Sequence, residues 1–380
     1  MLSPPNALLA EILQRRVQGE KKVRAVVSKM GRILTFTLSL FLLPAKIVAA
    51  ASTFLPIYSG PVYQSSEVWI QGGNSIEANT TGAYLKISFS GRSLALVVDT
   101  SNNASELPKL GIRIDSGSVR DVQITERGSF VTVPLVSPSD LDSQAWHEAR
   151  ISLEGLGRDN RWIPPSGSLK IDSLKVLGFA LDDGAQMRGP LVKNKRMVVY
   201  GDSITEGARM FGGDDHVIDK EWWPTWESQI AEDIGAEIGT VGYQGEGLEV
   251  SGGGGVPGLL YSFDQIRSGV YRNFSRPDYV FLAHGANGSP SSDQVLQMVA
   301  NLRRAYPVSK IFLCVPFGGY SRSAITQAYY SQQDPNVHLV DLGDAAAQAV
   351  LQNSVDQLHP NPGGNRIIAN LMESQISSFL

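Results

Sequence analysis

The feature that most constrains the fold is the segment 198–207, which reads VVYGDSITEG. An apolar, β-branched run ends there in a turn of small residues, and the turn carries Ser203. Buried parallel strands have this pattern, and in open α/β sheets ligands and reactive groups lie at the carboxyl ends of the strands. The segment therefore predicts an α/β sheet with Ser203 at its functional edge. Because serine alone is a weak nucleophile, its base, orienting group and oxyanion donors have to come from elsewhere in the chain.

Composition limits the class of protein. The chain has 380 residues, a length typical of about two domains. Its net charge of -4 gives no reason to expect nucleic acid, which requires a basic face. The 38 glycines follow no repeat period. Cys314 is the only cysteine and lies in an apolar run, so we expect it in the core and no intramolecular disulfide is possible.

The first 52 residues have the pattern of a secretory signal. Residues 1–29 are basic, residues 33–43 are apolar, and residues 49–52 are small. The apolar run is shorter than the ~20 residues that span a bilayer, so we expect no stable membrane insertion after cleavage. This predicts a secreted, periplasmic or cell-envelope protein. Met30 is an alternative translation start, and an uncleaved anchor is the alternative to cleavage.

The segment 53–187 is predicted to be an all-β, jelly-roll-like sandwich domain. Short apolar or alternating runs recur at roughly 8–12-residue spacing and are separated by turn-forming clusters. We expect strands at 84–89, 94–98, 111–114, 130–133 and 149–153.

From residue 188 to residue 380, strand-like and helix-like runs alternate. We expect strands at 197–200, 240–241, 278–283, 311–316 and 337–341. We expect helices at 222–234, 292–306, 323–332, 344–352 and 365–379. This alternation predicts a three-layer α/β domain with a largely parallel sheet.

A base for Ser203 is available near the C-terminus. His359 lies in a loop rich in proline and glycine just before the last predicted helix. It can take the serine proton during attack and return it to the leaving group. Asp356, three residues earlier, can turn back to orient the imidazole and stabilise its charged form.

Oxyanion stabilisation requires donors aimed at the developing negative charge. The backbone N–H of Ser203 is the first candidate. Gly245, in the glycine-rich loop 242–247, offers a second N–H, and the side-chain amide of Asn287 offers a third. Each of the last two, taken alone, is equally well explained as an ordinary turn residue.

Together these residues resemble the SGNH (GDSL-type) hydrolase superfamily over about 197–380. The blocks are Gly201-Asp202-Ser203-Ile204, Gly245, Gly285-x-Asn287 and Asp356-x-x-His359, in that order. The resemblance implies a flavodoxin-like fold and carboxylester hydrolysis with no metal or other cofactor. It assigns Ser203 as nucleophile, His359 as base and Asp356 as its orienter, with Ser203, Gly245 and Asn287 as the oxyanion hole. Gly288 departs from the family pattern, which usually has aspartate there.

A β-sandwich followed by an SGNH domain resembles carbohydrate esterase family 2, whose members remove acetyl groups from sugars. The resemblance implies an acetylated poly- or oligosaccharide as substrate, and we expect a monomer. Two alternatives stay open: a lipolytic GDSL esterase that acts on longer acyl esters, and a carbohydrate-binding protein whose hydrolase domain has lost activity.

Other conspicuous residues have ordinary explanations. The tryptophans 222, 223 and 226 are expected in the core, although one of them is a candidate sugar-stacking wall. His216, beside two aspartates, is expected in a solvated loop, because no second group of metal ligands accompanies it. The glycines 252–255 are expected to form a flexible loop near the cleft. Asn287 also begins a glycosylation sequon, and a place in the active site predicts that it is unmodified.

Overall fold

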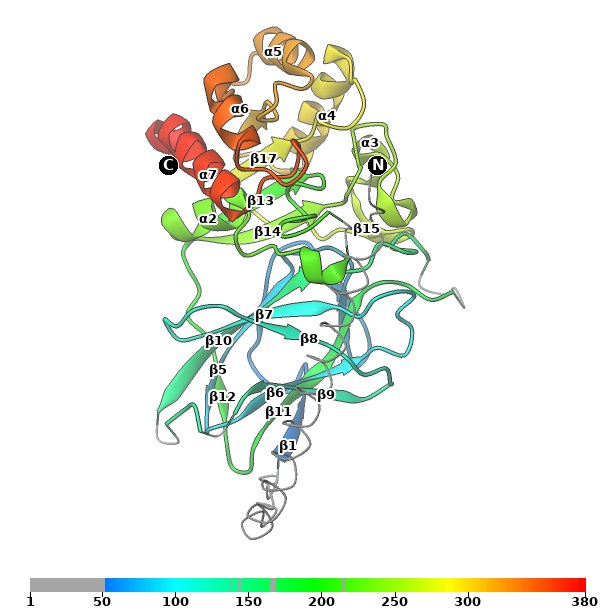
Figure 1. Ribbon diagram of the computed structural model, residues 1–380, viewed down its shortest axis with the longest axis vertical. Helices are drawn as coiled ribbons and strands as arrows, with labels where there is room; N and C mark the ends of the chain where they lie inside the picture. Colours follow the sequence, from blue (N-terminus) through cyan, green and yellow to red (C-terminus); the bar gives the residue numbers. More distant parts are fainter. Residues whose placement is uncertain (1–51, 138, 143–144, 165–168, 214–215) are drawn as a thin grey trace, which may run out of the picture. The chain divides into compact units, whose positions relative to one another are not determined.

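The structure is a computed structural model that describes residues 52–380, except 138, 143–144, 165–168 and 214–215 (Figure 1). From residue 52 on, the chain belongs to one compact unit. The predicted signal segment lies outside the described residues except for Ser52, which begins β1 (Ser52–Pro56), and Met30 lies outside them too. No helix in the described part of the chain is long and apolar enough to span a bilayer.

The first half of the described chain forms two antiparallel sheets. One sheet contains β1 and also β3 (Ile70–Gln71), β4 (Ile76–Ala78), β6 (Leu94–Asp99), β9 (Val131–Val136) and β11 (Leu174–Asp182). The other contains β2 (Tyr63–Gln64), β5 (Tyr84–Ser90), β7 (Lys109–Ile114), β8 (Arg120–Gln123), β10 (Trp146–Gly155) and β12 (Met187–Arg188). The first sheet has the order β3-β4-β11-β6-β9, with β1 beside β11, and the second has the order β12-β5-β10-β7-β8, with β2 beside β5.

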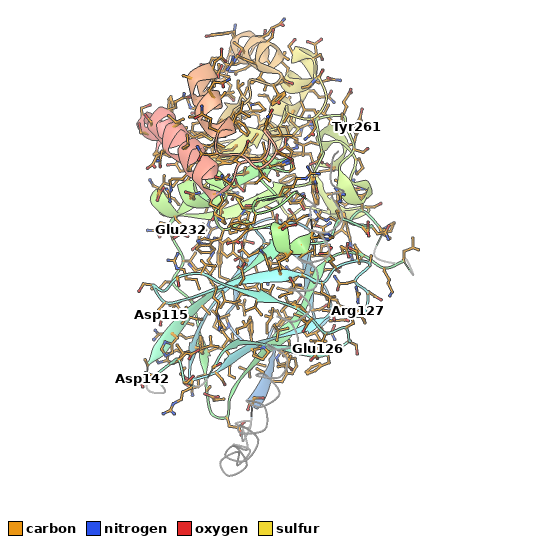
Figure 2. The ribbon with its side chains drawn as sticks, in the orientation of Figure 1. Asp115, Glu126, Arg127, Asp142, Glu232 and Tyr261 are labelled. Atoms are coloured by element: carbon orange, nitrogen blue, oxygen red, sulfur yellow. The ribbon has the colours of Figure 1, made fainter. Side chains whose placement is uncertain are left out.

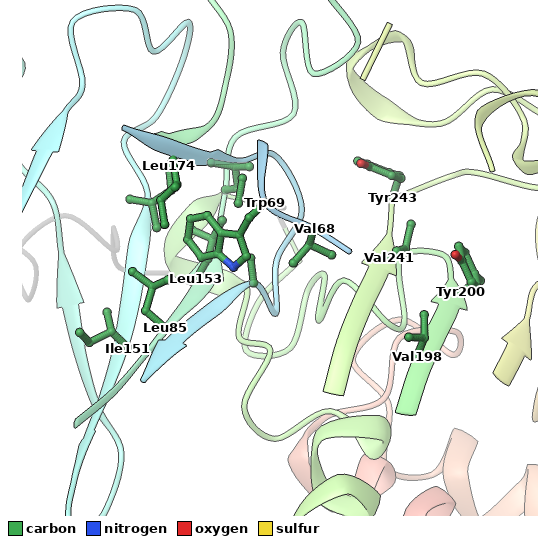
Figure 3. Close-up of a cluster of buried hydrophobic side chains, with 14 of the residues drawn as sticks. Val68, Trp69, Leu85, Ile151, Leu153, Leu174, Val198, Tyr200, Val241 and Tyr243 are labelled. Atoms are coloured by element: carbon green, nitrogen blue, oxygen red, sulfur yellow. The ribbon is translucent and has the colours of Figure 1, made fainter. Parts of the chain in front are cut away.

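Period-2 alternation explains how these strands bury one face. In β9, Val131 is buried and Thr132 is exposed, because successive side chains of a strand point to opposite faces. Leu85 of β5 pairs with Ile151 of β10, and both side chains are almost fully buried. Figure 3 shows them in one cluster with the indole of Trp69. This apolar interior accounts for the strand-rich region that the sequence predicts.

The second half of the chain contains a parallel sheet. Its strands are β13 (Lys195–Gly201), β14 (Ala236–Gly242), β17 (Tyr279–Ala283), β18 (Lys310–Cys314) and β19 (Val337–Val340). They lie in the order β14-β13-β17-β18-β19, and every neighbouring pair is parallel. Numbered along the chain, this is the 2-1-3-4-5 order of flavodoxin-like folds. The predicted fold class is confirmed.

Helices cover both faces of this sheet. They are α2 (Trp226–Asp233), α4 (Ser292–Ala305), α5 (Arg322–Ser331), α6 (Gly343–Leu351) and α7 (Pro362–Ile376). Along β13, Met197 and Val199 pack in one cluster with residues of α2 and α7, which lie side by side (Figure 1). Val198 and Tyr200 point to the other face and pack in a cluster with residues of α4 and α5. The continuous apolar run of β13 is thus explained by burial on both faces.

The expected and the observed elements differ in several places, and two of these differences have a clear physical cause. The helix predicted from residue 222 begins only at Trp226, because Pro224 lies in a turn where the Thr225 N–H donates to the Trp222 carbonyl at 2.9 Å. The strand β11 was not expected, although it lies in the middle of its sheet. Its apolar pattern is broken at Gly178, where the pairing with β6 shifts register.

The antiparallel and parallel regions contact each other through polar pairs. Glu237 at the start of β14 accepts hydrogen bonds from Tyr84 at 2.5 Å and Lys86 at 2.7 Å, both in β5. Glu232 of α2, labelled in Figure 2, accepts from Arg150 of β10 at 2.5 Å and from Arg113 of β7 at 3.3 Å. The carboxylates come from the second half of the chain and their donors from the first.

Candidate active site

Ser203 lies in the turn that follows β13, beside the point where the strand order reverses between β14 and β17. The turn is closed by hydrogen bonds from the Glu206 N–H to the Asp202 carbonyl at 2.9 Å and from the Ala208 N–H to the Ser203 carbonyl at 2.9 Å. Gly201 is needed at the strand end, since a Cβ there would lie 2.0 Å from the Thr205 hydroxyl oxygen. The packed turn fixes the Ser203 backbone at the carboxyl edge of the sheet.

The structure brings His359 and Asp356 to Ser203. The Nε2 atom of His359 lies 2.9 Å from the Ser203 Oγ, and its Nδ1 lies 2.8 Å from Asp356 Oδ2. Ser203 is 5% exposed and His359 is 6% exposed, so their contact is shielded from water. The arrangement is a continuous hydrogen-bonded chain from hydroxyl to imidazole to carboxylate, as the sequence predicts.

The loop that carries His359 is held at both ends. Val355 N–H donates to the His359 carbonyl at 2.9 Å, and an isolated bridge joins Ser354 to Pro360. Asn361 then caps α7, because its side chain accepts the Gly364 N–H at 3.0 Å. The cap places the start of α7 directly behind the histidine.

Arg209 is a site residue that sequence reasoning missed. Its Nη1 lies 3.0 Å from Asp356 Oδ2, the same oxygen that faces His359. Asp356 Oδ1 accepts the backbone N–H groups of Leu358 and His359 at 3.1 and 2.7 Å. Partial burial acts to raise the pKa of Asp356, but the hydrogen bonds and charge of His359, together with Arg209, lower that pKa well below its ordinary value. Asp356 is therefore ionised and faces the imidazole as an anion.

The predicted oxyanion donors gather beside the serine turn. Gly245 has φ of 77°, the left-handed region that favours glycine, in a turn closed by the Glu246 N–H and the Tyr243 carbonyl at 3.0 Å. Within the described part of the chain, the N–H groups of Ser203 and Gly245 donate to no protein acceptor. They are therefore available to a ligand.

Asn287 joins the two turns. Its Nδ2 donates to Asp202 Oδ2 at 3.2 Å and to the Glu246 carbonyl at 3.1 Å. Both amide N–H groups are thus engaged, and Asn287 has to break one of these hydrogen bonds to bind an oxyanion. Burial raises the pKa of Asp202, an effect opposed by the nearby His284.

Gly288, the departure from the family pattern, is required by this backbone. It has φ of +82°, and a Cβ there would lie 2.8 Å from Val250 Cγ2. A glycine therefore stands where an aspartate would be both strained and crowded.

Behind this loop, Glu246 is fully buried. It accepts a hydrogen bond from the Ser262 hydroxyl at 2.9 Å, and His284 Nε2 lies 3.4 Å away.

The remaining candidates are explained by burial or by a local ion pair. Trp222 and Trp226 are 0% and 3% exposed, so neither forms a sugar-stacking wall. Cys314 is buried, as expected, and burial raises the pKa of its thiol. His216 Nδ1 lies 2.6 Å from Glu106 Oε1. Across the described residues, no group of three or more histidine, cysteine or acidic side chains is placed to hold a metal ion.

One comparison with known proteins matches the parallel-sheet half of the chain to a described family. Residues 197–372 match the family model described as GDSL-like Lipase/Acylhydrolase. No curated protein matches the chain.

Solved structures share the fold over almost their whole length. A family two carbohydrate esterase from Clostridium thermocellum, in complex with cellohexaose, has a TM-score of 0.68 at 17% identity, covering 84% of this chain and 98% of that one. The acetyl xylan esterase Est2A from Butyrivibrio proteoclasticus has a TM-score of 0.68 at 13% identity, with coverages of 87% and 98%. A salicylyl-acyltransferase from a tetracycline biosynthetic pathway has a TM-score of 0.60 at 13% identity, again with coverages of 87% and 98%. At these identities the likeness shows the fold alone.

Proposed function

We propose that the chain is a serine esterase that removes acetyl groups from carbohydrate, because residues 197–372 match the GDSL-like lipase/acylhydrolase family model. The observation that carries the proposal is the hydrogen-bonded chain of Ser203, His359 and Asp356 at the carboxyl edge of the sheet. Nucleophile, base and orienter are thereby within hydrogen-bond distance of one another.

In the first step the Ser203 Oγ attacks the acetyl carbonyl carbon. The proton of the hydroxyl passes to His359 Nε2, which already lies 2.9 Å from the oxygen. The imidazolium that forms is stabilised by the ionised Asp356 at Nδ1. The negative charge on the former carbonyl oxygen is stabilised by the N–H groups of Ser203 and Gly245, and by an Asn287 N–H once it breaks one of its present hydrogen bonds.

Collapse of the tetrahedral intermediate breaks the ester C–O bond. His359 gives its proton to the departing sugar oxygen, which leaves as a hydroxyl group, and the acetyl group remains on the Ser203 oxygen. A water molecule, deprotonated by the same imidazole, then attacks the acetyl carbon. The second collapse releases acetate and restores the Ser203 hydroxyl. The steps need no cofactor, and each proton transfer uses the one histidine.

A small apolar cavity beside the serine turn supports a short acyl group. It is lined by residues that include Ile204, Trp226, Phe317 and Ile368, and its volume is about 40 Å³. One water molecule occupies roughly 10–15 Å³ on this measure, so the cavity holds only a few atoms. If the acyl group enters it, the cavity has room for the methyl group of an acetyl ester.

Two exposed aromatic rings that lie close in sequence to residues of the site support a sugar as the alcohol portion of the ester. Phe211 is 56% exposed and lies two residues after Arg209. Tyr320 is 43% exposed and precedes Ser321, whose hydroxyl donates to the Gly285 carbonyl at 2.9 Å. Aromatic rings with one free face are suitable platforms for the apolar face of a sugar ring.

The test is acetate release from acetylated xylan, acetylated glucomannan and acetylated peptidoglycan, with Ser203→Ala as the control. We expect release from at least one polysaccharide by the wild type and none above background by the variant. A series of p-nitrophenyl esters from acetate to decanoate separates this proposal from a lipolytic esterase, because faster cleavage of the long chains would contradict an acetyl-specific site. Glycan binding without hydrolysis of any ester would instead support a binding protein.

We also propose that the protein acts outside the cytoplasm, as a secreted, periplasmic or cell-envelope enzyme. Support comes from the basic, apolar and small-residue runs of the first 52 residues. Cell fractionation together with sequencing of the mature N-terminus tests this, and a protein with an intact Met1 in the cytoplasmic fraction would contradict it.

A further inference from the structure

A single buried carboxylate joins the serine turn to the Gly245 turn. Glu206 follows Ser203 by three residues, and its side chain is completely buried. Its Oε2 accepts the backbone N–H of Gln244, the residue before Gly245, at 2.6 Å. The two backbone donors of the proposed oxyanion hole, on Ser203 and Gly245, are therefore tied together through Glu206.

Two buried cations hold this carboxylate. Arg161 Nη2 lies 2.7 Å from Glu206 Oε1, and Lys220 Nζ lies 3.1 Å from the same oxygen. The three side chains are 0–1% exposed. Burial acts to raise the pKa of Glu206, but Arg161 and then Lys220 outweigh it and lower that pKa to about 2. A buried carboxylate stays ionised only when cations pair with it. The position of the Glu206 side chain therefore depends on Arg161 and Lys220.

Arg161 comes from outside the segment that matches the hydrolase family. It lies between β10 and β11, in the strand-rich half of the chain. Its Nε donates to the Gly157 carbonyl at 2.7 Å and its Nη2 to the Leu156 carbonyl at 3.0 Å, which fixes the guanidinium. The strand-rich half thus supplies a fixed cation, Arg161, that pairs with Glu206 of the serine turn.

The segment 79–81, also in the strand-rich half, fastens the same two turns by hydrogen bonds. Thr81 Oγ1 donates to the Glu206 carbonyl at 2.9 Å. Thr80 Oγ1 donates to the Gly242 carbonyl at 3.1 Å and accepts the Gly242 N–H at 3.2 Å. Asn79 accepts the Tyr243 hydroxyl at 3.1 Å and donates to the Arg161 carbonyl at 3.0 Å. This segment and Arg161 therefore both hold the serine turn and the Gly245 turn in place.

We propose that Arg161 is a positioning residue for the oxyanion hole: through Glu206 it holds the serine turn and the Gly245 turn in register. The proposal rests on the esterase function proposed above, and it gives the strand-rich half an indirect part in catalysis. Arg161 touches no reacting atom. Its effect should therefore fall on stabilisation of the transition state, and hence on kcat, while KM stays nearly constant.

The test compares Arg161→Met and Arg161→Lys with a matched control in the full-length protein. The control is Arg267→Met, because Arg267 Nη1 lies 3.0 Å from Glu77 Oε1 in another shielded ion pair that joins the two halves. That pair has side chains only 9% and 14% exposed, and neither residue bonds to the serine or Gly245 turn. The assay measures kcat and KM for p-nitrophenyl acetate well below the melting temperature of each variant.

We expect Arg161→Met to lower kcat by about 10²-fold, since a displacement near 1 Å costs this much, with KM changed less than threefold. Arg161→Lys should recover part of kcat, and Arg267→Met should keep kcat within about twofold at a comparable loss of melting temperature. If Arg161→Met does not fold, Arg161→Lys, which keeps a cation beside Glu206 but loses the fixed guanidinium geometry, is compared with the Arg267→Met control instead, and its kcat should still be lower than that of the control.

A kcat of the Arg161 variant no lower than that of the Arg267 control would overturn the positioning role. This outcome is distinct from failure of the proposed function. If the wild type does not cleave p-nitrophenyl acetate or any acetylated glycan, the esterase proposal fails; if it does and the Arg161 variant keeps its kcat, only the positioning proposal fails.

Discussion

The imidazole Nε2 of His359 lies 2.9 Å from the Ser203 Oγ, although 156 positions separate the two residues along the chain. The contact forms because the turn after β13 and the loop before α7 both lie at the carboxyl edge of the sheet. It follows that base and nucleophile are paired before substrate arrives, and that changes to either should act mainly on the chemical step.

His359→Ala removes the base, and we expect kcat for p-nitrophenyl acetate to fall by about 10²–10⁴-fold with a smaller change in KM. Asp356→Asn removes the charge that faces the imidazolium and should also lower kcat, by up to about 10⁴-fold. Steady-state kinetics check both variants, with circular dichroism as the folding control. A His359→Ala enzyme with wild-type kcat would rule out the assigned base.

Asn287→Ala tests the side-chain oxyanion donor. Removal of one such donor typically costs about 10²–10³-fold in kcat. In this chain Asn287 also joins Asp202 to the Glu246 carbonyl, so we expect a lower melting temperature as well. Mass spectrometry of the secreted protein should find Asn287 unglycosylated, and a glycan on Asn287 in active enzyme would exclude it from the oxyanion hole.

Gly288→Asp restores the residue usual in the family, yet we expect it to harm this enzyme. A non-glycine residue in the left-handed region costs roughly 1–2 kcal/mol, and the new Cβ would meet Val250 Cγ2 at 2.8 Å. Melting temperature and kcat should both fall. The double variant Gly288→Asp/Val250→Ala removes the contact and keeps the backbone strain, so it should recover only part of the lost melting temperature and kcat. A Gly288→Asp enzyme with higher activity than the wild type would contradict this account of the loop.

Glu221 gives a stability that depends on pH. Burial, followed by the nearby Asp121, raises the pKa of Glu221 to about 7. A carboxyl whose pKa is raised by folding stabilises the native state at low pH, and this contribution is lost as pH rises from about 4.5 to 7. Glu221→Gln should therefore raise the melting temperature by about 2–4 °C at pH 8 and have little effect near pH 4.5. Glu126→Gln, an exposed carboxylate, is the control, and an equal effect of Glu221→Gln at both pH values would refute the shift.

The parallel sheet could be predicted because its strands are continuous apolar runs bounded by turns, as in 197–200 and 311–316. The strand β11 could not, since Gly178 breaks its pattern and its burial between β4 and β6 is a tertiary property. The start of α2 at Trp226 was also missed, because the tryptophans 222 and 223 extend the helical pattern through a turn that Pro224 favours.

The candidate site was predictable where function imposes a motif. Ser203, His359 and Asp356 stand in recognisable blocks, and the order of the blocks places them at one sheet edge. Arg209 and Arg161 belong to no such block. Each acts by filling a place beside a carboxylate, and only the packed structure shows which carboxylate lies within reach.

The central claim is that Ser203 attacks the ester and carries the acetyl group. Its most direct test is the pre-steady-state reaction of wild type and Ser203→Ala with p-nitrophenyl acetate, followed by mass spectrometry of the quenched protein. We predict that the substitution lowers kcat by about 10⁴–10⁶-fold, and that an acetyl adduct appears on Ser203 of the wild type alone. Equal rates for the two proteins would contradict the account.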